Sequence, residues 1–194
     1  MLFTGRYMKT RLGIARRLFC LNRPFYGHLG KKALIYKPKF IYGTKNIFLG
    51  NDSYFLYGAR IQVFKKNGKN PKLIIGNGTT FEQFAHVTCG ESIEIGDHAM
   101  ILANVCITDI DHVVNPENGP YGFQEHQTKP VKIGNNVFVG MGSFIFPGTV
   151  LGDNVVVGAN SVVRGSFPAD VMIAGSPAKV IKRFDREKKE WVRV

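Results

Sequence analysis

Cysteine, acidic residues and long apolar runs are all scarce in this sequence. Its 194 residues include 3 cysteines and 14 acidic residues, against 26 lysines and arginines. Three cysteines without CxxC spacing cannot staple a domain, so we expect free thiols and a reducing compartment. The most apolar stretch near the start, 18–21, is far shorter than the roughly 20 residues that cross a bilayer, and no signal-peptide core precedes it. We therefore expect a cytoplasmic protein.

The shortage of acidic residues leaves a formal net charge of +12 and a pI near 9.8. Such a charge attracts phosphate, anionic cofactors or anionic surfaces without choosing among them. No aromatic-basic motif of a known nucleic-acid reader accompanies it, so no nucleic acid is expected as a partner. With 44% hydrophobic residues, the chain has the composition of a single globular domain, which excludes disorder and collagen-like repetition.

An aliphatic or aromatic residue recurs at every sixth position along most of the chain, often followed by glycine. These positions form five sets of three: Leu49, Phe55, Ile61; Ile75, Phe81, Val87; Ile95, Ile101, Ile107; Ile133, Val139, Ile145; and Leu151, Val157, Val163. The period fits neither an amphipathic helix nor a half-exposed strand, so it predicts a solenoid. If three short strands make one triangular coil, successive coils stack as parallel strands about 4.8 Å apart. We therefore predict an all-β, parallel β-helix solenoid of about five triangular coils.

Two segments interrupt the repeat and two flank it. Segment 65–72 has the composition of a surface turn, whereas the long excursion 108–130 is where a rigid scaffold would hold binding or catalytic groups. We predict an N-terminal basic helical cap over 1–40, the repeat domain over 41–177 and a C-terminal basic helix over 178–194. The cap would cover the open end of the solenoid. Its basic helix also offers a peripheral contact with an anionic membrane surface.

Three motifs are set in the hexapeptide array: TDIDH at 108–112, KPVKIGNNVFVG at 129–140 and IAGSPAKVI at 173–181. Together they resemble the left-handed parallel β-helix acyltransferases, and more narrowly the maltose and galactoside O-acetyltransferases with their relatives from capsule and exopolysaccharide gene clusters. The resemblance covers residues 73–183 well and 41–72 loosely. It implies left-handed winding, a homotrimer whose active sites lie in clefts between neighbouring coils, acetyl-CoA as co-substrate and no permanently bound cofactor.

The excursion contains His112, at the position of the family's catalytic histidine. An alcohol is a poor nucleophile until its proton is being removed, and imidazole suits that task near neutral pH. We predict that His112 is the general base that activates a sugar hydroxyl for direct attack on the thioester. Asp109 and Asp111 either fix the imidazole tautomer, bind acceptor hydroxyls or form the turn, and these alternatives stay open. No covalent acetyl-enzyme is expected, because Cys89 and Cys106 have no base at a recognisable spacing.

The resemblance also assigns residues to the two substrates. The acceptor is assigned to Glu82, His86 and Asn104, with Glu82 standing where related sugar acetyltransferases have asparagine. Coenzyme A is placed along the trailing coils, where backbone amides would meet its thioester end and basic side chains its phosphates. The residues assigned to coenzyme A are Phe138, Met141, Ala159, Arg164, Lys179 and Lys182.

Three classes of function remain open at this point. The first is O-acetylation of a bacterial capsular or exopolysaccharide glycan or its precursor, with N-acetylation of an amino sugar as a variant. The second is a metal-dependent hydratase of the carbonic anhydrase-like branch, and the third is a scaffold that binds without turnover. His86, His98 and His112 could supply metal ligands, but their spacings of 12 and 14 residues match no recognised ligand pattern, so no metal site is predicted. His98 and His126 are expected to be structural or exposed.

Overall fold

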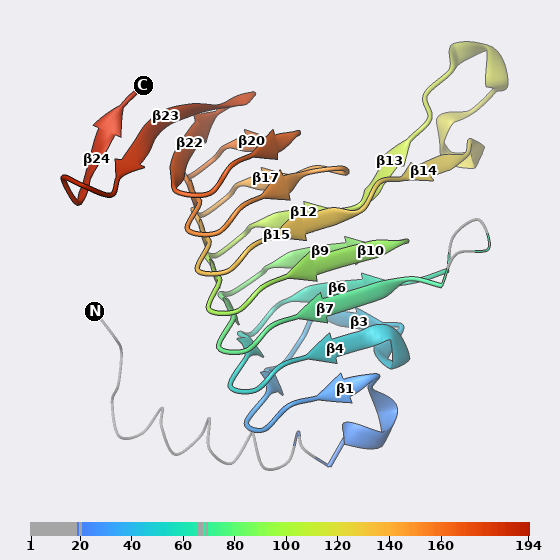
Figure 1. The fold of residues 1–194 in the computed structure, drawn as a ribbon. Coiled ribbons are helices and arrows are strands. Elements are labelled where there is room, and N and C mark those ends of the chain that lie inside the picture. The colour runs from blue at the N-terminus through green and yellow to red at the C-terminus, as the bar shows by residue number, and fades with distance from the viewer. Residues whose placement is uncertain (1–18, 20, 66–67, 69) are drawn as a thin grey trace.

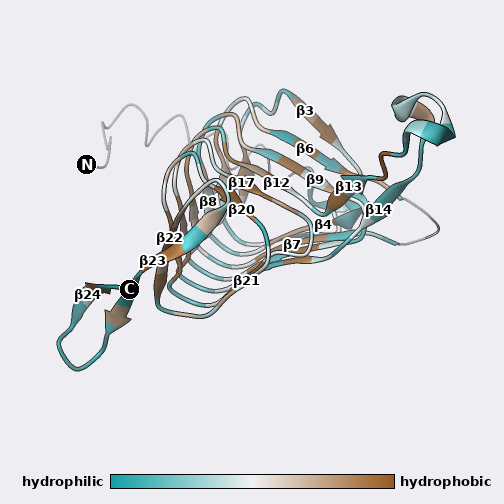
Figure 2. Cartoon of the chain, turned by 90° about the horizontal axis from the view of Figure 1, so that it is seen from above, coloured by the Kyte–Doolittle hydropathy of each residue, from teal (hydrophilic) through white to brown (hydrophobic). Residues whose placement is uncertain are grey.

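The structure is a computed structural model that describes residues 19, 21–65, 68 and 70–194. Its strands form a parallel β-helix with three faces, seen from the side in Figure 1 and along the helix axis in Figure 2. Face A contains β1 (His28–Leu29), β4 (Ile47–Leu49), β7 (Lys72–Ile75), β10 (Ser92–Ile95), β15 (Val131–Ile133), β18 (Val150–Leu151) and β21 (Ser166–Phe167). Face B contains β2 (Leu34–Ile35), β5 (Tyr54–Phe55), β8 (Thr80–Phe81), β11 (Met100–Ile101), β16 (Phe138–Val139), β19 (Val156–Val157), β22 (Val171–Gly175), β23 (Ala178–Asp185) and β24 (Glu190–Arg193). Face C contains β3 (Phe40–Tyr42), β6 (Arg60–Val63), β9 (His86–Cys89), β12 (Cys106–Thr108), β17 (Phe144–Ile145) and β20 (Val162–Val163).

The three faces meet at corners that we name AB, BC and CA after the faces that they join. The predicted solenoid is confirmed: all fifteen residues of the six-residue pattern are buried, and they form the core. Phe55 and Phe81 stack in it on successive coils, with ring centroids 3.9 Å apart. Buried polar side chains at the corners are satisfied, as when the Ser53 hydroxyl donates to the Gly76 carbonyl at 2.6 Å. An added Cβ on Gly76 would lie 2.5 Å from the backbone of the next coil, so the glycine allows the coils to stack this closely.

The β-helix has six complete coils in the described part of the chain, one more than predicted, followed by β21 and β22. The additional coil consists of β1, β2 and β3, which fall largely within the segment 1–40 that we predicted to be a helical cap. That prediction is wrong for this part, because Leu29, Ile35 and Ile41 keep the six-residue spacing and pair in register with the next coil. Most of the predicted basic helix falls on residues 1–18 and 20, outside the described residues. A short 3-10 helix, η1 (Arg23–Phe25), precedes β1.

The predicted C-terminal helix is also wrong, because residues 178–194 form the antiparallel strands β23 and β24. Gly175, with φ of +106°, lies where the chain turns back, and β23 then pairs with β22. Side chains alternate between half-buried and exposed along β23, which is the period of a strand. Val180 and Ile181 at its centre are β-branched and favour this conformation. The hairpin projects from the β-helix on the side away from the β13–β14 arm (Figure 2).

The predicted excursion 108–130 is confirmed as an arm that projects from the CA corner between β12 and β15 (Figure 1). Its two sides are β13 (Ile110–His112) and β14 (His126–Thr128), which pair antiparallel. Its tip contains the 3-10 helices η3 (Pro116–Asn118) and η4 (Tyr121–Phe123), while η2 (Thr44–Asn46) lies at the CA corner of the first two coils. No helix within the described residues is long and apolar enough to cross a membrane.

Candidate active site

Asp109 anchors the foot of the arm at the CA corner. Its buried carboxylate accepts hydrogen bonds from the backbone N–H groups of Gly90 at 2.7 Å and of Glu91 and Ser92 at 2.8 Å each. Its own carbonyl accepts from the Lys129 N–H at 2.8 Å, which closes the base of the hairpin. Bonds to an ionised acceptor are the strong ones, and they compensate for burial of the carboxylate. Of the roles that the sequence left open for Asp109, these contacts support turn formation.

His112 lies at the end of β13 with an exposed side chain. Its partner across the hairpin is His126, and the two rings lie with centroids 4.1 Å apart at 53° to each other. The next rung is closed by the Val113 N–H, which donates to the Glu125 carbonyl at 3.0 Å. The arm therefore presents the predicted base to solvent with a second imidazole packed against it.

His126 was not among the predicted site residues, and the sequence contains one indication that could have found it. In an antiparallel hairpin, two residues equally far from the base of the hairpin face each other. His112 follows Asp109 by three positions, and His126 precedes Lys129 by three positions. Pairing of the two ends of the excursion would thus have predicted the contact.

Arg164 links the arm to the sixth coil. Its Nη1 and Nη2 atoms both lie 3.3 Å from Oδ2 of Asp111, the residue that precedes His112. The guanidinium carbon lies 4.8 Å from the ring centroid of Phe146, so the arginine is stacked as well as paired. An ion pair this exposed contributes about 0.2–1 kcal/mol, so its value here is orientation more than stability. We assigned Arg164 to coenzyme A, and in this structure it is engaged with Asp111.

His86 lies on the outer surface of face C, in register with Arg60 on one side and Cys106 on the other. Its Nε2 lies 3.1 Å from Oγ1 of Thr88. Burial, together with the positive charge of Arg60, lowers the pKa of His86 below its ordinary value. The ring is therefore neutral near pH 7 and offers a hydrogen-bond donor or acceptor to a hydroxylic ligand. Its role as an acceptor contact remains a prediction.

Four predicted residues lie along the BC corner on successive coils: Glu82, Asn104, Met141 and Ala159. Backbone hydrogen bonds link the turns that contain them, from Asn104 to Gln83, from Gly142 to Ala103 and from Asn160 to Met141. Glu82 is half-buried and the other three are exposed. On this corner, the residues assigned to the acceptor thus occupy the third and fourth coils, and those assigned to coenzyme A occupy the fifth and sixth.

The remaining predicted residues lie on face B. Phe138 is in register with Val156, which is in register with Met172, and Met172 faces Lys182 of β23. Lys179 pairs with Ala174 on the same two strands and is exposed. Within one chain, face C separates the arm and His112 from the BC corner and from this ladder. The structure therefore does not bring all predicted site residues together in a single chain.

The two described cysteines are free thiols. Burial raises the pKa of Cys89 and of Cys106, and the nearby Asp109 carboxylate, 3.6 Å from the Cys89 sulfur, raises that of Cys89 further. A protonated, buried thiol is a weak nucleophile. Neither side chain is arranged to accept an acetyl group.

The three histidines considered as metal ligands lie apart. His86 is on face C, His98 is in the AB corner between β10 and β11, and His112 is on the arm. In the part of the chain that the structure describes, no group of three or more histidine, cysteine, aspartate or glutamate side chains is placed to hold a metal ion.

The chain is similar to known acyltransferases in sequence and in structure. A family model described as the hexapeptide repeat of succinyl-transferase matches residues 130–164. WbbJ of Escherichia coli K12, named as a candidate lipopolysaccharide biosynthesis O-acetyl transferase, is 33% identical over 88% of this chain and 87% of its own. A galactoside O-acetyltransferase of the same organism is 31% identical over 88% of this chain and 78% of its own. AntD, an N-acyltransferase from Bacillus cereus solved with dTDP and 3-hydroxybutyryl-CoA, superposes with a TM-score of 0.70 at 25% identity, covering 88% of this chain and 90% of that chain.

Proposed function

Because the chain belongs to the hexapeptide-repeat acetyltransferase family, we propose that it transfers an acetyl group from acetyl-CoA to a hydroxyl group of a bacterial surface glycan or of its precursor. Similarity to a lipopolysaccharide and a galactoside O-acetyltransferase supports a sugar acceptor. The acyl-CoA in the AntD complex supports the donor. The observation that carries the mechanism is the anchored arm, which holds His112 outside the coils with its strand tied down by Asp109 and by the Asp111–Arg164 pair.

His112 accepts the proton of the sugar hydroxyl as the oxygen attacks the thioester carbonyl. A tetrahedral intermediate forms, and backbone N–H groups near Met141 and Ala159 stabilise its oxyanion. The carbon–sulfur bond then breaks, and the imidazolium returns the proton to the leaving thiolate. The products are the acetyl ester and free coenzyme A, with His112 neutral again. Lys179 and Lys182 supply positive charge for the nucleotide phosphates.

A complete site needs a second copy of the chain. The arm projects from the CA corner, whereas the residues assigned to coenzyme A follow the BC corner on the other edge of face C. If the CA corner of one copy lies beside the BC corner of the next, His112 faces Met141 and Ala159 of its neighbour. Contacts of this head-to-tail kind close into a ring when the rotation allows it. The family resemblance implies that three copies close this ring, which gives a homotrimer with three equivalent sites.

Mixed oligomers test this arrangement. We expect His112→Ala and Met141→Trp to be inactive alone, because the first removes the base and the second blocks the thioester site. Co-expressed and co-purified, the two variants should recover activity, since a site formed by the intact His112 of one chain and the intact Met141 of the other remains. Absence of recovery in oligomers shown to contain both chains would contradict a site shared between copies.

Product analysis tests the reaction itself. Purified protein incubated with acetyl-CoA and a panel of mono-, oligo- and polysaccharides should give products heavier by one acetyl group in a mass spectrum. Mild base removes an O-acetyl ester but leaves an amide, so it separates hydroxyl acceptors from amine acceptors, the alternative that the likeness with AntD, an N-acyltransferase, supports. An amide product would show that the acceptor is an amine and not a hydroxyl. The donor and the role of His112 in the proposal would then be unchanged. Absence of any acetylated product across the panel would contradict the proposal.

We place the reaction in the cytoplasm. The thiols of Cys89 and Cys106 are free, as in proteins of reducing compartments. Acetyl-CoA is itself a metabolite of that compartment.

A further inference from the structure

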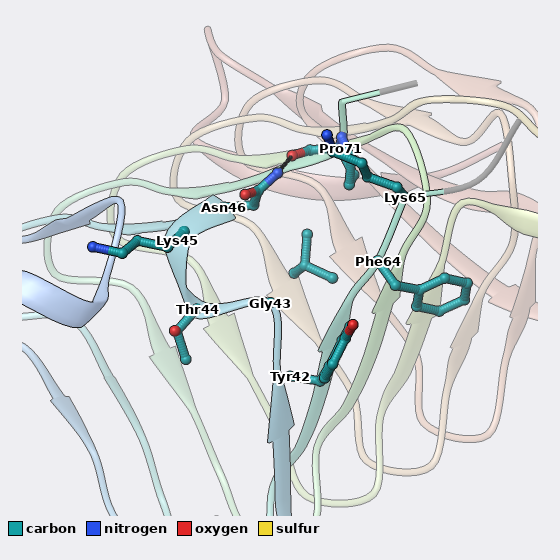
Figure 3. A pocket seen from close by; sticks show the side chains of 9 residues that line it. Tyr42, Gly43, Thr44, Lys45, Asn46, Phe64, Lys65 and Pro71 are labelled. Atoms are coloured by element: carbon teal, nitrogen blue, oxygen red, sulfur yellow. Dashed lines mark hydrogen bonds between the residues drawn. The ribbon is translucent and has the colours of Figure 1, made fainter. Parts of the chain in front are cut away.

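A hollow opens on the CA corner of the first two coils, below the arm on the same edge of the β-helix (Figure 3). Its volume is about 500 Å³. Tyr42, Thr44 and Asn46 line one side of it, from the end of β3 and from η2, and Phe64 and Lys65 line the other, directly after β6. Tyr42 is 57% exposed, and its side chain borders the hollow. None of the described residues that line the hollow is acidic.

The backbone around the hollow is fixed. Gly43 has φ of +75°, and an added Cβ would lie 1.7 Å from the carbonyl oxygen of Val63, so the two coils meet there in contact that glycine alone permits. The Asn46 amide donates to the Pro71 carbonyl at 2.6 Å, which ties η2 to the far end of the β6–β7 connection. The hollow is thus a built feature of the corner between these coils.

A ladder of polar side chains connects the hollow to the arm along the edge of face C. Tyr42 is in register with Gln62, Gln62 with Thr88, and Thr88 with Thr108. Thr108 directly precedes Asp109, where the arm begins. All four side chains point outward, because they alternate along their strands with residues that are buried or packed against the core. With parallel strands about 4.8 Å apart, the ladder extends roughly 14 Å from Tyr42 to Thr108.

The ladder side chains are held in place by their neighbours. The side-chain Oε1 of Gln62 accepts from Nε of Arg60 at 3.0 Å, and the Thr88 hydroxyl lies 3.1 Å from Nε2 of His86. In these contacts, the Gln62 amide and the hydroxyls of Thr88 and Thr108 each keep at least one further position for a hydrogen bond. A row of fixed amide and hydroxyl groups can therefore exchange hydrogen bonds with successive hydroxyls of a sugar chain.

We infer that the hollow and the ladder form an extended acceptor track for an acidic oligosaccharide, on the basis of the function proposed above. A monosaccharide at His112 cannot reach the hollow, whereas a chain of several sugar residues spans the ladder. The exposed ring of Tyr42 offers a flat apolar surface to the face of a sugar ring. Lys65 at the hollow, with Arg60 beside the ladder, favours an acidic unit at the far end of the sugar chain, whereas the Lys45 ammonium points away from the hollow and donates to the Pro24 carbonyl. The acetylated residue lies at the arm and the anchoring residue in the hollow.

Binding to a catalytically inactive protein tests the track separately from turnover. We would titrate the assembled His112→Ala protein with galacturonate and its oligosaccharides up to the hexasaccharide. Glucose and malto-oligosaccharides of the same lengths are the neutral counterparts. Affinity for the acidic series should rise at least about tenfold from monosaccharide to tetrasaccharide, as additional hydrogen bonds form along the ladder. The neutral series should bind more weakly at each length. Equal affinity for monosaccharide and tetrasaccharide would overturn the track.

Variants locate the binding. Tyr42→Ala and Gln62→Ala should each lower tetrasaccharide affinity by about three- to tenfold, the loss expected for one contact, and leave monosaccharide affinity unchanged. Val150→Ala is the control, because Val150 is an exposed side chain, at 40%, on face A of the sixth coil, away from the ladder and the hollow. An equal loss in Val150→Ala would place the binding elsewhere and overturn the track. Circular dichroism and the midpoint of thermal unfolding confirm that each variant is folded.

A third arm separates a glycan chain from a nucleotide-linked sugar. UDP-galacturonate also joins an aromatic group, negative charge and a sugar, so it is titrated beside the oligosaccharides. Tighter binding of UDP-galacturonate than of the tetrasaccharide, abolished by Tyr42→Ala, would overturn the oligosaccharide assignment. Length-dependent binding by a protein that acetylates no acceptor would reject the proposed function and leave the track in place, so the two failures are distinguishable.

Discussion

The imidazole rings of His112 and His126 lie with their centroids 4.1 Å apart across the β13–β14 hairpin. This contact is one of three that position the exposed base. Asp109 clamps the foot of the arm with three backbone hydrogen bonds, and Arg164 ties Asp111 to the sixth coil. Catalysis depends on holding a reacting group close to its productive geometry, so we expect each contact to affect turnover.

Loss of the His126 ring should weaken catalysis through the orientation of His112. We expect His126→Ala to lower kcat roughly tenfold with little change in KM, because His112 then loses the ring that holds its orientation. Displacing a catalytic group by about 1 Å can lower the rate about a hundredfold, so a tenfold loss corresponds to a smaller displacement. His126→Phe keeps an aromatic ring against His112 and should retain turnover within about twofold of the wild type. Steady-state kinetics on both variants check this. A similar loss in both would show that the polar nitrogens of His126 matter and packing does not.

Asp109→Asn should destabilise the protein. The amide keeps the shape of the side chain but turns an NH₂ group towards backbone N–H donors, which leaves buried donors unpaired. We expect the free energy of unfolding to fall by about 2–4 kcal/mol, which corresponds to a lowering of Tm by roughly 4–16 °C. Differential scanning calorimetry measures the change. Asp52→Asn, which removes an exposed carboxylate 3.6 Å from Lys32, is the control, and an equal effect of both substitutions would contradict the clamp.

The Asp111–Arg164 pair should behave as one unit in a double-mutant cycle. We expect Asp111→Ala and Arg164→Ala each to lower kcat by roughly 3–10-fold, and the double variant to be no slower than the worse single variant. Arg164→Lys keeps the positive charge but loses the planar guanidinium, which both contacts Asp111 through two nitrogens and stacks on Phe146. Its kcat should therefore lie between those of Arg164→Ala and the wild type. If Arg164→Ala instead raised KM for acetyl-CoA and Asp111→Ala did not, Arg164 would belong to the donor site and not to the arm.

The lowered pKa of His86 makes stability depend on pH. Because the folded protein resists protonation of this ring and the unfolded chain does not, the contribution is complete above the ordinary pKa of about 6.5 and is lost as pH falls below it. We expect Tm to fall more steeply in the wild type than in His86→Gln between about pH 7.5 and pH 5.5. Thermal unfolding at several pH values checks this, and parallel slopes for the two proteins would exclude the effect.

The sequence predicted the coils well because the six-residue spacing is a local constraint. Each inward residue, such as Val139 or Val157, is apolar and buried, and glycine recurs where the backbones of two coils meet. The same spacing extends to Leu29, Ile35 and Ile41, most of which the predicted helical cap over 1–40 had included because of the alternating apolar and basic residues at 11–23. In the C-terminal segment, the many charged residues led to the prediction of a helix. The β-branched side chains of Val180 and Ile181 favour a strand, and the structure has a strand there.

The site was less accessible to sequence reasoning because it depends on contacts between distant residues. Asp111 and Arg164 are 53 positions apart, and no local pattern links them. Asp109 could have been a catalytic or a turn-forming residue until its three backbone partners were known. The order of the residues along the BC corner could not be derived from the sequence, because insertions between repeats change the register. Only the structure shows which coil contains each residue.

Acceptor-dependent release of the coenzyme A thiol from acetyl-CoA is the measurement that decides whether His112 is the base. Wild type, His112→Ala and His98→Asn would be compared with the same acceptor, His98 being an exposed histidine in the AB corner. We expect His112→Ala to lower kcat by about 10²–10⁴-fold, with KM for acetyl-CoA unchanged and His98→Asn equal to the wild type. Turnover by His112→Ala at the rate of the wild type would contradict the assignment of His112 and the purpose of the arm.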